Sequence, residues 1–113
     1  HTSGGSDAPV VSFDAMENIY FAVTRKNISG QPQEGWIPSE KISVDEAVKL
    51  FTKNAAYASY TEDENGTIEV GKNADFVVLE KNIYEIDPDE IKATKVDMTV
   101  LGGEIVYERK VEE

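Results

Sequence analysis

The segment from Ile42 to Tyr60 constrains the fold of this chain more than any other part of the sequence. Ser43 and Glu46 near its start form an S-x-x-E capping box, in which each side chain can accept a hydrogen bond from the backbone of the other residue. Apolar residues then recur at the spacing of one helical face: Val44, Ala47, Val48, Phe51, Ala55 and Ala58. We therefore predict one helix over residues 42–60. Its alanines favour helix and allow close packing against a neighbour.

A second helix is predicted over residues 14–26. Asp14 can cap its first turn, and Glu17 lies three residues later in capping-box register. An apolar stripe follows at helical spacing, formed by Met16, Ile19, Tyr20 and Val23. This stripe predicts which face of the helix is buried.

Two stretches have the composition of loops. Residues 27–40 hold two glycines and two prolines, which interrupt regular structure. Two large apolar residues in this stretch, Trp36 and Ile37, are predicted to be buried and to fix the loop to the core. Residues 1–6 are small and polar, and they resemble a cloning remnant, a linker or a loop rather than the start of a packed element.

Beyond residue 61 the sequence favours strands and turns. Four short runs are predicted to be strands: residues 67–70, 75–80, 96–101 and 104–108. The β-rich run DFVVLE at 75–80 predicts a central strand. Gly102 and Gly103 tolerate the positive φ angles that a two-residue hairpin turn requires. A short helix is predicted to begin with Pro88, and residues 110–113 are predicted to fray. The predicted fold class is therefore mixed α/β, with helices first and strands after them.

Charge excludes several kinds of partner. The 113 residues carry 22 acidic and 11 basic side chains, a formal net charge of −11. Most of the excess lies in residues 62–113, where 15 acidic and 6 basic side chains leave a net charge of −9. Such a chain repels nucleic-acid phosphates and anionic lipids, so we expect neither a nucleic acid nor a membrane as partner. No apolar run approaches the roughly 20 residues that span a bilayer.

The chain has no cysteine and a single histidine, His1. Disulfides, thiolate zinc sites and a cysteine nucleophile are therefore excluded, and so is a Ser-His-Asp triad. Either the chain is not a complete enzyme, or its chemistry avoids histidine and cysteine. The absence of cysteine is compatible with a reducing cytoplasm, and we expect a cytoplasmic location.

Asp7 is the one carboxylate set among small residues, in the sequence GSDAPV at positions 5–10. Small neighbours leave room around the carboxylate, and a carboxylate of this kind can bind a divalent metal and accept a proton from water. The alternative is an aspartate that caps a turn, which is common. The acidic run at 62–64 lacks the ligand spacing of a calcium loop and is predicted to be a solvated turn.

Four motifs, in order along the chain, resemble metal-dependent amidohydrolases. The most specific is GTIEVGKNADFVVL at residues 66–79, which is similar to the closing segment of that family. The others are the helix start and end at 42–47 and 51–56, the last strands at 96–100 and 103–107, and the GSDAPV segment at 5–10. The last of these resembles the end of the eighth barrel strand in the amidohydrolase family 3 branch.

The resemblance implies a (β/α)₈ barrel with a divalent metal, often zinc, and a small β-sandwich built from both chain ends. Residues 1–60 would be the end of the barrel, a loop plus two helices, and residues 61–113 the C-terminal part of the composite sandwich. The implied reaction is hydrolysis of C–N bonds in small amides, cyclic amides or amidines, or deamination of ring amines. Asp7 falls on the position of the strand-eight aspartate, a metal ligand and the general base toward water.

The His-x-His pair, the bridging lysine or glutamate and the two later histidines of the family are absent from this sequence. We therefore expect the C-terminal portion of a longer enzyme that acts on a small amide-type substrate. By itself this portion is expected to be inactive, to bind no metal and to self-associate. Two alternatives remain open: an acidic interaction module that binds a basic partner through residues 62–113, and a structural cap domain without a ligand.

Overall fold

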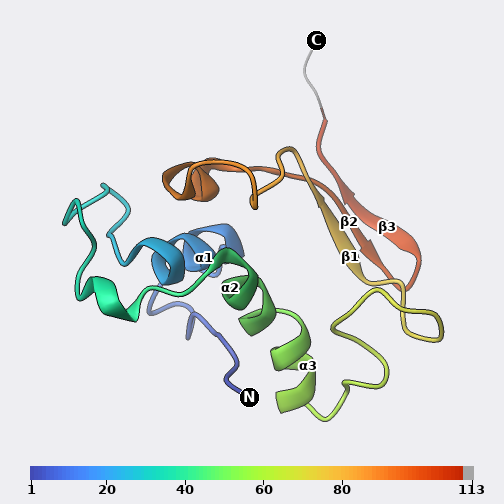
Figure 1. The fold of residues 1–113 in the computed structure, drawn as a ribbon. Helices are drawn as coiled ribbons and strands as arrows, with labels where there is room; N and C mark the ends of the chain where they lie inside the picture. Colours follow the sequence, from blue (N-terminus) through green and yellow to red (C-terminus); the bar gives the residue numbers. More distant parts are fainter. Residues whose placement is uncertain (111–113) are drawn as a thin grey trace.

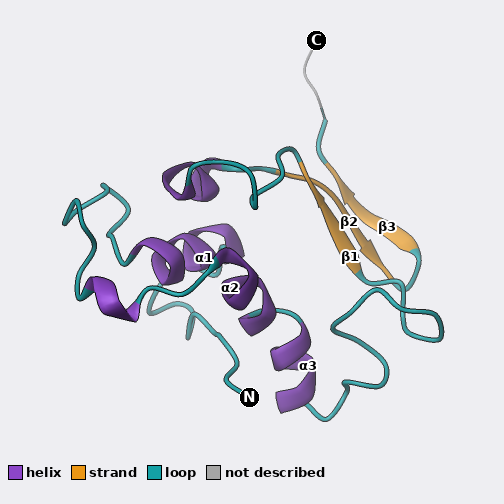
Figure 2. Ribbon diagram, viewed as in Figure 1, coloured by secondary structure: helices purple, strands orange, loops and turns teal. Residues whose placement is uncertain are grey.

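The computed structural model describes residues 1–110, and helices precede strands in it (Figures 1 and 2). The α-helices are α1 (Ala15–Thr24), α2 (Val44–Leu50) and α3 (Lys53–Ala58), and the strands are β1 (Phe76–Leu79), β2 (Val96–Leu101) and β3 (Glu104–Glu108). Two 3₁₀ helices, η1 (Pro38–Glu40) and η2 (Pro88–Ala93), complete the elements. The predicted mixed α/β class is confirmed as helices followed by antiparallel strands. The predicted fraying covers residues 110–113, of which residues 111–113 lie outside the described part.

Helix α1 forms where the sequence predicts it, but its cap differs. The Asp14 carboxylate accepts a hydrogen bond from the Met16 backbone N–H at 2.9 Å. The predicted capping box with Glu17 does not form, because the Asp14 N–H donates to Ser12 Oγ at 3.1 Å instead. The predicted apolar stripe is confirmed: all four of its residues are buried, and Tyr20 is fully enclosed.

The prediction of one helix over residues 42–60 is wrong, since the segment contains two short helices. The capping box at its start is confirmed: the Ser43 N–H donates to Glu46 Oε2 at 2.9 Å, and the Glu46 N–H donates to Ser43 Oγ at 3.2 Å. The helix breaks at Thr52, whose φ of −126° and ψ of −98° are not helical. The Thr52 hydroxyl donates to the carbonyl oxygen of Val48 at 2.8 Å, a local bond that competes with the helical pattern.

Residues 27–40 form the predicted loop, but its large apolar side chains are not buried. Trp36 is 65% exposed and Ile37 is 45% exposed. The loop is fixed by its backbone instead, because the Trp36 N–H donates to the Arg25 carbonyl at 2.7 Å. Gly35 is the buried residue there, at a φ of +82°, and a Cβ atom at this position would collide with the Thr24 carbonyl oxygen. The backbone thus approaches α1 closely and leaves the indole ring facing outward.

The sheet is antiparallel with the order β1-β2-β3, so β1 is an edge strand and β2 is central. The prediction that residues 75–80 form a central strand is therefore wrong. The hairpin of β2 and β3 around Gly102 and Gly103 is confirmed, with φ angles of +58° and +81°. The predicted strand at 67–70 does not form: among residues 1–110 no segment pairs with it, and a strand needs a partner for its backbone groups.

The core lies between the helices rather than on the sheet. It consists of buried residues from α1, α2, η2 and the segment after β1: Met16, Ile19, Tyr20, Val23, Ala47, Ile83 and Ile91. The sheet contributes Val100, while Val77, Ile105 and Val106 are each more than half exposed. Within the described residues, no helix has the length and hydrophobicity to cross a membrane.

Candidate functional site

Asp7, the candidate identified from the sequence, lies at the start of an exposed turn. The Val10 N–H donates to the Asp7 carbonyl oxygen at 2.9 Å and closes this turn. Asp7 has a φ of +51°, in the left-handed region that is uncommon for residues other than glycine but less so for aspartate. Its side chain is exposed, and no residue of the described range donates a hydrogen bond to its carboxylate. The carboxylate is therefore free to meet a ligand.

The residues before Asp7 form a loop, one of the alternatives that the sequence left open, and this loop is hydrogen-bonded to the helices. The Gly4 N–H donates to the Leu50 carbonyl at 3.0 Å, and Asn54 Nδ2 donates to the Thr2 carbonyl at 2.9 Å. The His1 ring stacks on Tyr57 with the ring centres 4.0 Å apart. Figure 1 shows this N-terminal stretch beside α2 and α3 before the chain turns toward α1.

The residues after Asp7 are fixed at the start of α1. Asn18 Nδ2 donates to the carbonyl oxygens of Ser12 and Asp14, at 3.1 and 2.7 Å. These bonds tie the end of the turn region to the first turn of the helix. Asp7 therefore lies on a segment that is held at both ends, by the α2–α3 junction and by the N-terminus of α1.

Asp7 has no companion that could complete a metal site. No group of three or more His, Cys, Asp or Glu side chains in residues 1–110 is placed to hold a metal ion. A structural or catalytic zinc needs at least three protein ligands. The described residues therefore do not fit a metal on their own.

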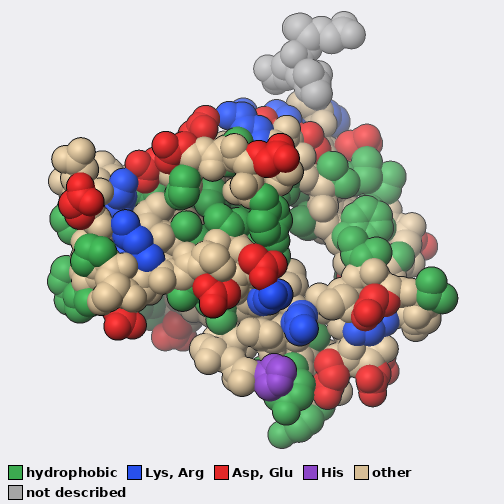
Figure 3. Space-filling view, in the orientation of Figure 1, with side chains coloured by type: hydrophobic (Ala, Val, Ile, Leu, Met, Phe, Trp, Pro, Cys, Tyr) green, Lys and Arg blue, Asp and Glu red, His purple; other side chains and the backbone are tan. Residues whose placement is uncertain are grey.

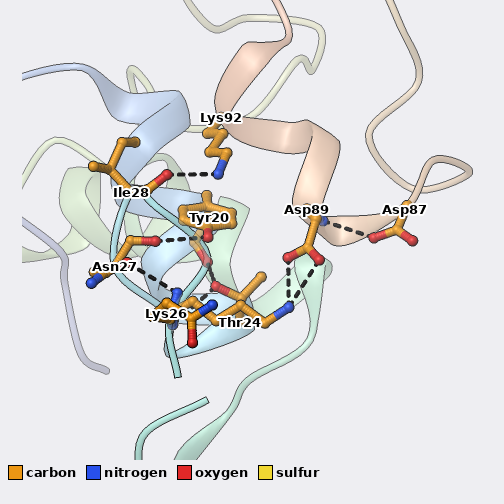
Figure 4. Close-up of polar contacts among 9 residues, drawn as sticks. Tyr20, Thr24, Lys26, Asn27, Ile28, Asp87, Asp89 and Lys92 are labelled. Atoms are coloured by element: carbon orange, nitrogen blue, oxygen red, sulfur yellow. Dashed lines mark hydrogen bonds and ion pairs between the residues drawn. The ribbon is translucent and has the colours of Figure 1, made fainter. Parts of the chain in front are cut away.

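A polar network that sequence patterns did not predict joins η2 to the C-terminal end of α1 (Figure 4). The Tyr20 hydroxyl donates to the Asn27 carbonyl at 2.9 Å. Lys92 Nζ donates to the Ile28 carbonyl at 2.8 Å and lies 4.6 Å from the centre of the Tyr20 ring. Lys26 Nζ donates to both carboxylate oxygens of Asp89, and this bond raises the pKa of Lys26 above its ordinary value of 10.5.

This network is structural, because its polar groups satisfy one another. The two lysine contacts join residues 63 and 64 positions apart in the sequence, and no local pattern relates them. The network fixes η2, and with it the segment that leads into β2, against the C-terminal end of α1.

A sequence model of the amidohydrolase family matches residues 1–107. The chain belongs to this family. The resemblance drawn from its motifs is confirmed.

The amidohydrolase chain is 39% identical over 107 residues to the Bacillus subtilis protein YtcJ, covering 95% of this chain and 20% of that protein. It is 35% identical over 104 residues to the N-substituted formamide deformylase of Arthrobacter pascens, covering 92% of this chain and 19% of the deformylase. It thus spans about a fifth of the length of these relatives.

The crystal structure of an amidohydrolase from Thermotoga maritima has a similar fold. The TM-score is 0.65 at 24% sequence identity, over 91% of this chain and 22% of that one. The similarity extends over helices and sheet together, since nearly all of this amidohydrolase chain is covered.

The amidohydrolase chain also has two open apolar grooves between its helices and its sheet. One, of about 750 Å³, is lined by Phe51 and Ala55 on the helical side and by Phe76 and Val77 on β1. The other, of about 440 Å³, continues along Phe51 and Val77 toward α1. Figure 3 shows the molecule hollowed between these parts. Asp7 lines neither groove, so the apolar space is separate from the candidate site.

Proposed function

We propose that this chain is the C-terminal portion of a metal-dependent amidohydrolase that hydrolyses C–N bonds, other than peptide bonds, in a small amide or amidine-type substrate. The observation that carries the proposal is the family match over residues 1–107, in a chain that spans about a fifth of its relatives. The relative named as a deformylase is named for N-substituted formamides, whose deformylation breaks a C–N bond. Residues 1–113 alone are proposed to be inactive.

Asp7 is proposed to be a catalytic residue of the complete enzyme, as a metal ligand and as the base that accepts a proton from the attacking water. Its exposed carboxylate, without a protein hydrogen-bond donor in the described range, supports this role. The left-handed backbone at Asp7 supports it as well, since residues held in sparsely populated conformations are frequent at functional sites.

The proposed metal is divalent, with zinc as the first expectation, and it would polarise the water that attacks the substrate. Residues 1–110 supply one carboxylate and no further ligand cluster, so the remaining ligands would come from the rest of the enzyme. The experiment on the isolated chain is metal analysis after purification, together with an assay for amide hydrolysis. Stoichiometric zinc or turnover in the isolated chain would contradict the proposal that the remaining ligands come from the rest of the enzyme.

Residues 1–60 are proposed to be the end of a (β/α)₈ barrel, and residues 61–113 the C-terminal part of a composite β-sandwich. The exposed edge and faces of the sheet support the second assignment, because a sandwich requires a second layer against one face. The apolar grooves between helices and sheet would be covered in the same way. The lack of cysteine fits the proposed cytoplasmic location.

The first experiment reads the encoding gene upstream of the codon for Gly5. The expected result is a continuous reading frame that contains a His-x-His sequence. A start codon at this junction would overturn the proposal and leave the acidic interaction module and the structural cap domain. The interaction module requires binding of a basic partner that vanishes at moderate salt.

The second experiment is Asp7→Asn in the full-length enzyme. This change keeps the size of the side chain and removes its basic oxygen, so kcat should fall by at least about 100-fold, with the melting temperature unchanged. Asp63→Asn is the matched control, because Asp63 is an exposed turn carboxylate remote in sequence from residue 7. Activity of the Asp7→Asn enzyme equal to that of the control would refute the assignment.

A further inference from the structure

We propose that Asn54 is a positioning residue for Asp7, and that the break between α2 and α3 exists to hold the segment that carries this carboxylate. The inference rests on the proposed function of Asp7 and adds to it a residue 47 positions away in the sequence. It follows from three contacts between residues 2–4 and the α2–α3 junction.

The first contact uses a carbonyl group that the helix break releases. In a continuous helix the Asn54 N–H would donate to the Leu50 carbonyl, four residues earlier. The non-helical backbone at Thr52 prevents this bond, and the next helix begins at Lys53. The Leu50 carbonyl instead accepts the Gly4 N–H at 3.0 Å. The break thus supplies an acceptor for the backbone of the Asp7 segment.

The second contact is the side chain of Asn54 itself. Its Nδ2 donates to the Thr2 carbonyl at 2.9 Å in a solvent-exposed hydrogen bond, and Asn54 as a residue is half-buried. The Thr2 C=O and the Gly4 N–H face the same junction, as the polar groups of alternate residues do along one edge of an extended strand. Two bonds spaced in this way fix the direction of the chain as well as its position.

The third contact is the close approach of Gly4 to the Phe51 ring. A Cβ atom on Gly4 would lie 2.8 Å from Cζ of Phe51 and 3.1 Å from both of its Cε atoms. The backbone therefore passes directly over the Phe51 ring, which packs against the core. A Cβ at position 4 therefore requires either the Phe51 ring or the N-terminal segment to shift.

Asp7 follows three residues after Gly4 and precedes the second fixed point, Ser12, by five. Between these points the structure gives the carboxylate no hydrogen-bond donor of its own, so its place is set by the two ends of the segment. A displacement of about 1 Å of a catalytic group can reduce the rate of a reaction about 100-fold. Asn54 is suited to prevent such a displacement without touching the substrate.

The test compares Asn54→Ala with Ser59→Ala in the full-length enzyme. Alanine has a higher helix propensity than asparagine, so α3 should persist in the variant. Ser59 is the matched control, because its hydroxyl bonds only within its own helix segment, to the Ala55 carbonyl. Amide hydrogen exchange, which needs no substrate, should increase over residues 2–12 in Asn54→Ala and stay unchanged over α1 and in the control.

The kinetic arm uses a panel of N-substituted formamides and cyclic amides as probes. We expect Asn54→Ala to lower kcat about 10- to 100-fold, with KM changed less than about threefold, because the carboxylate is misplaced and substrate contacts remain. In the Asp7→Asn background the same substitution should cause no further loss. Unchanged exchange over residues 2–12, or unchanged kcat in an enzyme that Asp7→Asn inactivates, would overturn the proposal.

A second variant pair separates positioning from general damage. Gly4→Ala should reproduce the increased exchange and the reduced kcat, and adding Phe51→Leu should restore both in part by making room for the new methyl group. Failure of the pair to restore exchange would argue against the proposed contact. An enzyme that stays active as Asp7→Asn would refute the proposed function of Asp7, while the exchange result would still decide whether Asn54 holds the segment.

Discussion

Tyr20 shows how much one side chain of this small core can contribute to the stability of the fold. It is fully buried, and its hydroxyl donates to the Asn27 carbonyl at the start of the long loop. Tyr20→Phe removes this donor and leaves the Asn27 carbonyl with its second one, the Gly30 N–H at 2.9 Å, and we expect a loss of about 1 kcal/mol in the free energy of unfolding. Urea denaturation measures it. Tyr60→Phe is the control, since Tyr60 is 93% exposed and should change nothing.

The capping box at Ser43 and Glu46 predicts how the stability of the fold depends on pH. The Ser43 N–H and hydroxyl both donate to the Glu46 carboxylate, and these bonds hold the pKa of Glu46 below its ordinary value of 4.5. A carboxyl group with a lowered pKa stabilises the fold above its unfolded pKa, and this contribution is lost as the pH falls through the folded pKa.

We therefore expect Glu46→Ala to lower the melting temperature at pH 7 and to differ less from the wild-type protein as the pH falls below 4.5. Thermal melts followed by circular dichroism from pH 7 to about pH 3 measure this difference. Glu34→Ala, in the exposed loop, serves as the control. A difference that grows in acid would show that the ionised carboxylate is not what stabilises the helix start.

At the scale of elements, the β2–β3 hairpin depends on its glycine pair. Gly103 has a φ of +81°, where a Cβ atom is unfavourable whatever the free space around it. Gly103→Ala should cost about 1–2 kcal/mol of unfolding free energy, the usual penalty of a left-handed backbone for a residue with a side chain. Gly5→Ala is the control for denaturation, because Gly5 has open space and no positive φ. Equal stability of the two variants would refute this account of the turn.

Local chemistry predicted those elements whose signals are contained in a few adjacent residues. The Ser43 capping box, the Gly102-Gly103 turn and the start of η2 at Pro88 were all predicted correctly. The break at Thr52 and the edge position of β1 were not. The break at Thr52 is accompanied by a local bond to the Val48 carbonyl, which the apolar spacing does not reveal. The edge position of β1 depends on which distant strands lie alongside, and an apolar strand such as residues 76–79 has the same composition at an edge as in the centre of a sheet.

The same distinction applies to the candidate site. Asp7 could be singled out because its small neighbours and its resemblance to a family motif are local. The contact of Asn54 with Thr2 spans 52 residues, and nothing near either residue predicts it. The resemblance of residues 51–56 to the end of a family helix includes this asparagine, but only the structure relates it to the Asp7 segment.

At the scale of the whole molecule, exposed apolar surface and net charge oppose each other. Val77 on β1 and Ile105 and Val106 on β3 are each more than half exposed, and such sheet surfaces favour association. The formal net charge of −11 makes copies of the chain repel one another. Salt screens this repulsion and leaves apolar contacts in place, because the Debye length falls from about 30 Å at 0.01 M to about 3 Å at 1 M.

We therefore predict that the isolated chain self-associates through its sheet and does so more strongly as salt is raised. Light scattering over a range of protein concentrations, at low and at high salt, should show the apparent mass increasing with both. Ile105→Lys, which places a charge on the exposed sheet, should reduce the association at high salt. Val10→Lys is the matched control, because Val10 is 75% exposed and lies in the turn after Asp7, outside the sheet. A monomer at every concentration and salt would refute the prediction. An equal loss of association in both variants would show that the added charge alone explains the effect, and this would contradict a contact through the sheet.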